Sequence, residues 1–273
     1  MYVDPAGLIP GINNGDIHIG GPGNEVVVTV SLTPPLPTIT SILHGATLQP
    51  GPVAPGQIVI ISGHTLGPST GVSATPDAGG IIETTLAGVS VLFDGIAAPL
   101  LLVREDQINA IVPYEVNAGA SSQVQVGPGI IGSIGSTPVP VQIVDVSPGI
   151  FTADSSGHGQ AAAINSDFTP NSVPNPASRG SVIMVFGTGA GQMNPPGKDG
   201  LVSNDLRRPV LPVTATIGGH PADVLYAGSA PALVSGVFQA NIRIPQQTEP
   251  GAAPIELKFG EAITQPGVTI AVR

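Results

Sequence analysis

The chain has 273 residues, and its 37 glycines and 30 prolines make up about a quarter of it. Glycine and proline are the poorest helix formers, so this composition excludes long helices, whereas a hydrophobic fraction of 41% excludes a disordered chain. A formal net charge of −10 argues against nucleic acid and anionic membranes as partners. No apolar run is long enough to span a bilayer, and the absence of cysteine excludes disulfides and thiolate metal sites.

Residues 1–37 are predicted to be an extended segment that precedes the domains. The first residues lack a basic stretch followed by an apolar one, so no signal peptide is visible. Residues 25–32 are expected to form a strand, and the prolines at 34, 35 and 37 predict an extended linker after it. One face of that strand carries apolar side chains at a spacing of two: Val26, Val28, Val30 and Leu32.

This strand is expected to pair, because burying four such side chains stabilises a protein by roughly 6–12 kcal/mol before ordering costs. The sequence leaves open whether it pairs within its own chain, but we expect strand addition to a neighbouring copy in preference to the first domain. Head-to-tail pairing of that kind predicts a homopolymeric filament. Arg207 and Arg208 are candidates for a charge contact between copies, because residues 38–146 carry a net charge of −6.

The rest of the chain contains an internal repeat. Three stretches return in the same order: 54–63 as 178–187, 93–98 as 217–222, and 107–113 as 239–245. The offset grows from 124 to 132 before the third stretch, so the second copy holds about eight extra residues around 228–236. We therefore predict two homologous domains, 38–146 and 147–273.

Each domain is predicted to have about seven short strands between Gly/Pro turns, which is typical of an immunoglobulin-like β-sandwich. The predicted fold class is all-β, with two tandem sandwiches. Asp94-Gly95 and Gly218-Gly219 are expected to be hairpin turns. Ile58 and Ile60, with their counterparts Val182 and Met184, are expected to face the cores. The predicted strands are 39–43, 57–62, 89–93, 99–103, 107–112, 122–126 and 139–145, then 160–165, 181–186, 213–217, 222–226, 237–244, 254–259 and 267–272.

Five stretches together resemble one protein family: 50–63, 187–191, 212–219, 237–245 and 266–272. They resemble the Solibacter-type C-terminal domain, which occurs at the ends of large predicted secreted proteins of acidobacteria. The resemblance covers the chain from Ile39 to Arg273. It implies an IPT/TIG-like immunoglobulin fold, an extracellular or cell-surface location, and a structural or binding role. It supplies no catalytic or binding residue.

The polar residues do not form a catalytic or metal-binding pattern. Histidines such as His64 and His220 lack the spacing of zinc ligands and are expected in turns. The cluster 154–160 contains serine and histidine but no nucleophile elbow, so a turn that bonds its own backbone is favoured. Three aspartates in long loops are weak calcium candidates without a calcium-loop pattern: Asp167, Asp199 and Asp205. No catalytic residue, cofactor or metal ligand is assigned.

A glutamine and an asparagine two residues apart occur in both repeats, as Gln107/Asn109 and Gln239/Asn241. Strand alternation puts each pair on one face. They are either a sugar-binding edge or side chains that tie a crossing loop to the strand, and their repetition favours the second interpretation.

We expect a non-enzymatic extracellular structural protein that assembles into a filament. The alternative is a binding or adhesion module of a larger secreted protein that recognises polysaccharide or protein.

Overall fold

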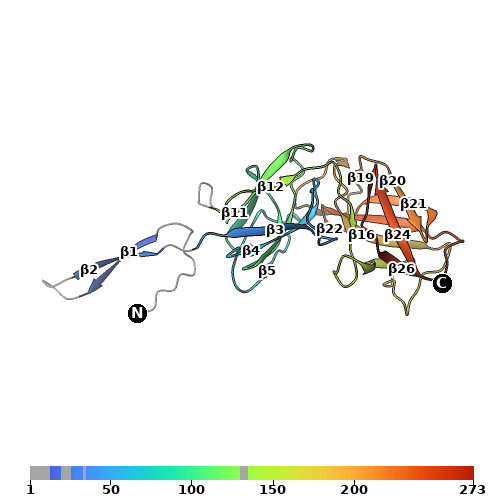
Figure 1. The fold of residues 1–273 in the computed structure, drawn as a ribbon, viewed down its shortest axis with the longest axis horizontal. Coiled ribbons are helices and arrows are strands. Elements are labelled where there is room, and N and C mark those ends of the chain that lie inside the picture. The colour runs from blue at the N-terminus through green and yellow to red at the C-terminus, as the bar shows by residue number, and fades with distance from the viewer. Residues whose placement is uncertain (1–12, 20–25, 33–34, 130–134) are drawn as a thin grey trace.

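The structure, a computed structural model, describes residues 13–19, 26–32, 35–129 and 135–273. In these residues it contains strands, turns and bends but no helix, as the composition predicted. Two immunoglobulin-like sandwiches follow one another, and a hairpin at the N-terminal end stands apart from them (Figure 1). The predicted fold class is confirmed.

The hairpin consists of β1 (Asn13–Ile19) and β2 (Val26–Leu32), which pair antiparallel with Ile17 opposite Val28. The strand predicted at 25–32 is present, and within this chain it pairs with β1 and not with the first domain, whereas strand addition to a neighbouring copy stays a prediction. Its partner β1 was missed, because β1 begins Asn-Asn-Gly-Asp and its alternation is limited to the last residues, Ile17-His18-Ile19, which is too short to predict a strand.

The first sandwich has two sheets with a shared core of residues between Ile42 and Ile143. One sheet has the order β3-β4-β10-β9-β5 and the other the order β12-β11-β7-β6, with β8 paired to β7. The strands are β3 (Thr38–His44), β4 (Ile58–His64), β5 (Val72–Ser73), β6 (Thr85–Leu86), β7 (Val89–Phe93), β8 (Ile96–Ala97), β9 (Leu100–Arg104), β10 (Gln107–Ile111), β11 (Ser121–Pro128) and β12 (Val139–Gln142).

The second sandwich repeats this plan around a core of residues between Ile150 and Val272. Its strands follow the path β13-β16-β23-β21-β20-β24-β26-β14, with β15 beside β16 and β25 beside β24. These strands are β13 (Gly149–Ile150), β14 (Gly159–Gln160), β15 (Ala163–Asn165), β16 (Val182–Thr188), β20 (Val213–Ile217), β21 (His220–Ser229), β23 (Val237–Arg243), β24 (Gly251–Phe259), β25 (Ala262–Ile263) and β26 (Val268–Val272).

The long strand β21 joins the two layers of the second sandwich, because it pairs first with β20 and then with β23. The same path in the first domain is divided into β8 and β9. Two further two-stranded sheets lie in the loops of the second domain: β17 (Met193–Asn194) with β19 (Arg208–Pro209), and β18 (Val202–Ser203) with β22 (Leu233–Val234).

The two predicted hairpin turns are confirmed. Both central residues have positive φ in each turn: 50° and 86° at Asp94 and Gly95, and 62° and 78° at Gly218 and Gly219. Positive φ at both positions defines the type I′ turn, whose twist matches that of the flanking strands.

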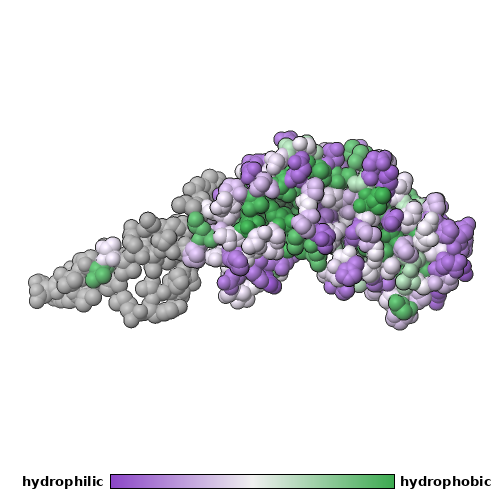
Figure 2. Space-filling model, in the orientation of Figure 1, coloured by the Kyte–Doolittle hydropathy of each residue, from purple (hydrophilic) through white to green (hydrophobic). Residues whose placement is uncertain are grey.

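The core-facing residues of β4 and β16 differ from the prediction. Val59 and Ile61 are fully buried in the first core, and their counterparts Ile183 and Val185 are fully buried in the second. The predicted residues, Ile58, Ile60, Val182 and Met184, are equivalent to one another but lie half-buried on the opposite face. Both faces of these strands are apolar, and Figure 2 shows hydrophobic surface over β3 and β4, so alternation could not identify the inner face.

Candidate functional site

The two domains are joined by a short stretch of sheet-like pairing across their boundary. Ile81 of the first domain and Leu201 of the second form an antiparallel bridge. On either side of it, Ile82 N–H donates to Gly200 O and Val202 N–H donates to Gly80 O, both at 2.8 Å. Backbone pairing of this kind fixes the distance between the two paired segments and their relative direction.

This pairing requires glycine at position 200. Gly200 has a φ of +67°, and a Cβ there would collide with Ile82 O in the first domain. An L-residue with a side chain would therefore face both backbone strain and a clash. The close approach of the two domains depends on the absence of a side chain at this point.

The eight extra residues of the second repeat lie at the same boundary. They contain β22, and Gly236 at their end is so close to the first domain that a Cβ would collide with Gly56 O. Thr188 Oγ1 donates to Gly236 O at 2.7 Å and accepts from Ile58 N–H at 2.8 Å. The sequence located this insertion, but only the structure shows that it contacts the first domain.

His44 holds the start of the second domain. Its Nδ1 accepts from Ala46 N–H at 3.0 Å and from Thr47 N–H at 3.3 Å, so the proton of the neutral ring is on Nε2, which donates to Ser147 O at 2.8 Å. Burial lowers the pKa of His44 below 6.5, against the opposing effect of the Ser147 hydrogen bond. The neutral ring satisfies all three backbone groups.

Asp199 and Tyr114 form a second polar contact between the domains. Tyr114 N–H donates to Asp199 Oδ1 at 3.0 Å, and Gln192 Nε2 donates to Tyr114 O at 2.7 Å. Burial raises the pKa of Asp199 to about 6, and nearby Glu115 adds to this against the Tyr114 hydrogen bond. Burial also raises the pKa of the Tyr114 hydroxyl. This contact therefore contains a carboxyl group that titrates near neutral pH.

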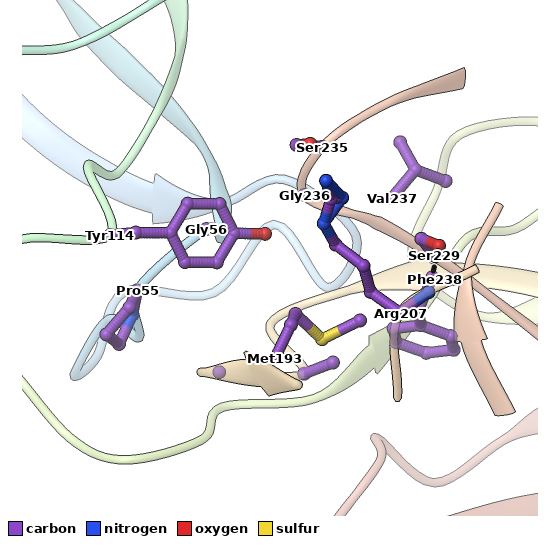
Figure 3. A pocket seen from close by; sticks show the side chains of 12 residues that line it. Pro55, Gly56, Tyr114, Met193, Arg207, Ser229, Ser235, Gly236, Val237 and Phe238 are labelled. Atoms are coloured by element: carbon purple, nitrogen blue, oxygen red, sulfur yellow. Dashed lines mark hydrogen bonds between the residues drawn. The ribbon is translucent and has the colours of Figure 1, made fainter. Parts of the chain in front are cut away.

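A small cavity between the domains is lined by Tyr114 from the first and by Met193, Arg207 and Phe238 from the second. The Tyr114 hydroxyl and the Arg207 guanidinium both point toward it (Figure 3). Its volume is about 10 Å³, which is room for about one water molecule and not for a substrate.

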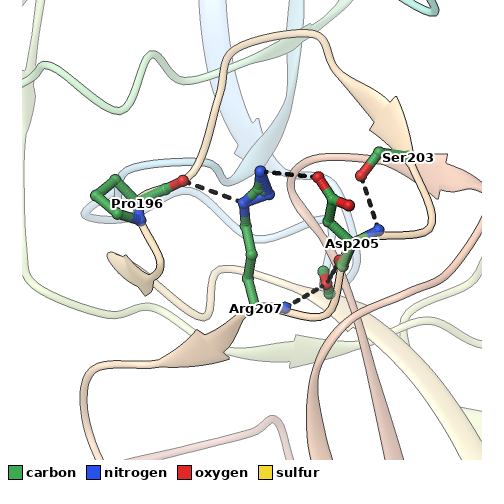
Figure 4. Close-up of polar contacts among 5 residues, drawn as sticks. Pro196, Ser203, Asp205 and Arg207 are labelled. Carbon is green, nitrogen blue, oxygen red and sulfur yellow. Dashed lines mark hydrogen bonds and ion pairs between the residues drawn. The ribbon is translucent and has the colours of Figure 1, made fainter.

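Arg207 is used inside its own chain. Its side chain is only 15% exposed, its Nε donates to Pro196 O at 3.1 Å, and its Nη2 lies 3.4 Å from Asp205 Oδ2 (Figure 4). Arg208 is exposed, with its guanidinium carbon 5.5 Å from the centre of the Tyr226 ring. Of the two arginines predicted to contact another copy, only Arg208 is exposed on the surface.

The predicted donor residues lie on β2. Val28 is 41% exposed. The other three predicted donor residues have side chains that lie outside the described part of the chain: Val26, Val30 and Leu32.

The polar loop clusters behave as local turns. Asp154 accepts from Ser156 N–H at 3.0 Å and from its hydroxyl at 2.7 Å, and Asp167 accepts in the same way from Thr169. Among the described residues, no group of three or more histidines or carboxylates could hold a metal ion. In the same residues, no helix is long and apolar enough to cross a membrane.

The repeated Gln/Asn pairs have the same geometry in both domains. Gln107 Nε2 donates to Asn109 Oδ1 at 2.7 Å, and Gln239 Nε2 donates to Asn241 Oδ1 at 2.7 Å. Each pair shares one strand face as predicted, but the two side chains bond each other and not a crossing loop.

Neither a scan of protein-family models nor a search of curated proteins finds a match to this chain. Among solved structures, it is similar to SGBP-B of a Bacteroides ovatus mixed-linkage glucan utilization locus, in complex with a mixed-linkage heptasaccharide. The identity is 13% and the TM-score 0.35, and the match covers 97% of this chain and 54% of that one, so this chain spans about half the length of SGBP-B. The D00-D0 domain of intimin is similar at 13% identity and a TM-score of 0.21, covering 85% of this chain and 99% of that one. The resemblance to the Solibacter-type domain stays a prediction.

Proposed function

We propose that this chain is a non-enzymatic extracellular structural protein whose two sandwiches act as one stiff unit. The observation that carries the proposal is the Ile81–Leu201 bridge with its two flanking backbone hydrogen bonds. Ile82 and Ile111 support it, because both are buried and neither belongs to a core cluster. Ile111 Cγ2 lies 3.2 Å from the position of a Cβ on Gly236 of the second domain. Burial between domains stabilises their relative orientation.

The stiffness is tested by placing a side chain at the boundary. Gly200→Val is expected to separate the domains, which increases the radius of gyration in small-angle scattering and splits the unfolding transition in two. Gly219→Val is the matched control, because Gly219 has a similar φ of +78° and open space around its Cβ position. It should carry the backbone strain alone, about 1–2 kcal/mol, without a change of shape. Equal scattering curves for the two variants would contradict the proposal.

Self-association through the N-terminal hairpin is part of the same proposal. The hairpin stands apart from the sandwiches (Figure 1), and Val28 on β2 is 41% exposed. Because β2 already pairs with β1, contact with another copy is between hairpins or between a hairpin edge and a sheet edge. Deletion of residues 1–33 should abolish assembly in sedimentation experiments and leave the melting temperature of the sandwiches unchanged. A full-length chain that stays monomeric at high concentration argues against a filament.

The extracellular location rests on composition, since only 10% of residues are charged and cysteine is absent. Protease treatment of intact cells tests it: a surface protein is degraded and an internal one is protected.

A second candidate function is a binding or adhesion module for polysaccharide or protein. It is favoured by an open polar groove beside Asp223 and Arg243 in the second domain.

A further inference from the structure

The groove lies on the surface of the second sandwich and has a volume of about 320 Å³. The start of β21 contributes Pro221 and Asp223, and the end of β23 contributes Arg243. The turn after β23 completes the wall with Pro245, Gln246 and Gln247. This volume is at the lower end of the range for small-molecule sites and holds about one or two sugar rings.

The internal repeat shows what this surface corresponds to. Arg243 pairs with Val182 in the second domain as Ile111 pairs with Ile58 in the first. Next to these pairs, Gly180 and Gly56 have φ values of +79° and +72°. The groove is therefore the counterpart of the surface around Gly56 and Ile111 in the first domain. In the first domain, that surface is covered by the second domain.

The residues at the two equivalent surfaces differ in polarity. In the first domain, Ile111 and Pro99 are buried, and Tyr114 contacts the second domain. At the repeat-equivalent positions the second domain has Arg243, Asp223 and Gln246, all exposed. An apolar surface that a neighbouring sandwich covers has become a polar one, so docking of a third sandwich in the same way is disfavoured.

The polar groups of the groove are available to a ligand. Arg243 donates one N–H, from Nη1, to Gly180 O at 3.1 Å. No hydrogen bond or ion pair with the residues that the structure describes is made by the remaining polar groups of the groove. These groups are the other N–H groups of Arg243, the Asp223 carboxylate and the side-chain amides of Gln246 and Gln247. Asp223 and Arg243 are direct cross-strand partners, so their charges offset each other.

This set of groups selects the chemistry of the ligand. An anion would meet Asp223 and a cation would meet Arg243, whereas a hydroxyl group both donates and accepts and can bond either residue or an amide. The proline rings of Pro221 and Pro245 supply apolar surface for C–H groups.

We propose that this groove binds an uncharged oligosaccharide, held by Asp223 and Arg243 at the centre and by Gln246 and Gln247 at the side. This inference rests on the second candidate function and is independent of the domain boundary. The Gly200→Val variant tests stiffness without changing the groove, and groove variants test binding without changing the boundary.

Affinity electrophoresis in gels that contain one soluble polysaccharide tests the proposal, with a β-glucan, an α-glucan, a mannan, a xylan and the acidic polygalacturonate as probes. We expect at least one neutral polysaccharide to retard the wild-type chain. Asp223→Ala and Arg243→Ala should each weaken that retardation by about tenfold or more. Glu256→Ala and Arg208→Ala are the matched controls, because both residues are exposed and outside the groove.

Exposed positions tolerate truncation, and unchanged melting temperatures of the groove variants would verify that they fold. Three results would overturn the inference: no retardation by any neutral polysaccharide, retardation by polygalacturonate alone, or equal retardation of the wild type and both groove variants.

Discussion

Acidification should weaken this protein through His44. Because Nδ1 accepts from Ala46 N–H, only the neutral ring fits, and burial lowers its pKa below the 6.5 of the unfolded chain. The unfolded chain therefore takes up a proton more readily than the folded one. The stability that depends on neutral His44 is complete above pH 6.5 and is lost as the pH falls below it, by up to about 1.4 kcal/mol per pH unit.

Asp199 acts in the opposite sense. Its pKa is raised from 3.8 to about 6, so the folded chain binds this proton more tightly than the unfolded one. The associated stability is complete below pH 3.8 and is lost as the pH rises through 6. Because the carboxyl is only half-buried, solvent screening limits its contribution to about 1 kcal/mol. The effects of His44 and Asp199 therefore partly offset each other in mildly acidic solution.

Denaturant unfolding between about pH 4 and about pH 8 separates the two groups. His44→Gln keeps an acceptor and a donor without titrating, so it should cost about 1–3 kcal/mol at neutral pH and flatten the decline on acidification. Asp199→Asn should make that decline steeper. If His44→Gln retains the pH slope of the wild type, the assignment of the slope to His44 is refuted.

Three other outcomes are expected. Ile111→Ala removes a fully buried side chain at the domain boundary and should lower the free energy of unfolding by about 2–5 kcal/mol, whereas Leu225→Ala, 48% exposed, should change it by about 0.5 kcal/mol or less. Asn171→Ala removes the buried amide that exchanges hydrogen bonds of 2.9 and 2.8 Å with Ala271, and should cost about 2–4 kcal/mol in the same assay; a loss equal to that of exposed Asn204→Ala would contradict this. EDTA should leave the melting temperature unchanged, because the described residues hold no metal-binding cluster, and a drop of several degrees would show that a metal site exists.

The sequence by itself determined the longer strands of both sandwiches, the repeat that relates them and the hairpin turn at Asp94-Gly95. These features depend on local alternation and on glycine at fixed positions, which act over a few residues. It also located the insertion around 228–236, since an offset between repeats can be read directly. It did not predict two-residue strands such as β5 and β8, and the single strand that it predicted at 160–165 is divided into β14 and β15.

Only the tertiary structure decided the rest. The inner face of β4 could not be predicted, because both of its faces are apolar and the choice depends on the opposing sheet. The partner of β2 was missed, since β1 lacks a strong strand pattern and its extended conformation is stabilised by the backbone hydrogen bonds that it makes to β2. The burial of Arg207 and the bridge at Ile81 join residues far apart in the chain. Such contacts depend on how the two domains pack, which no local pattern in the sequence records.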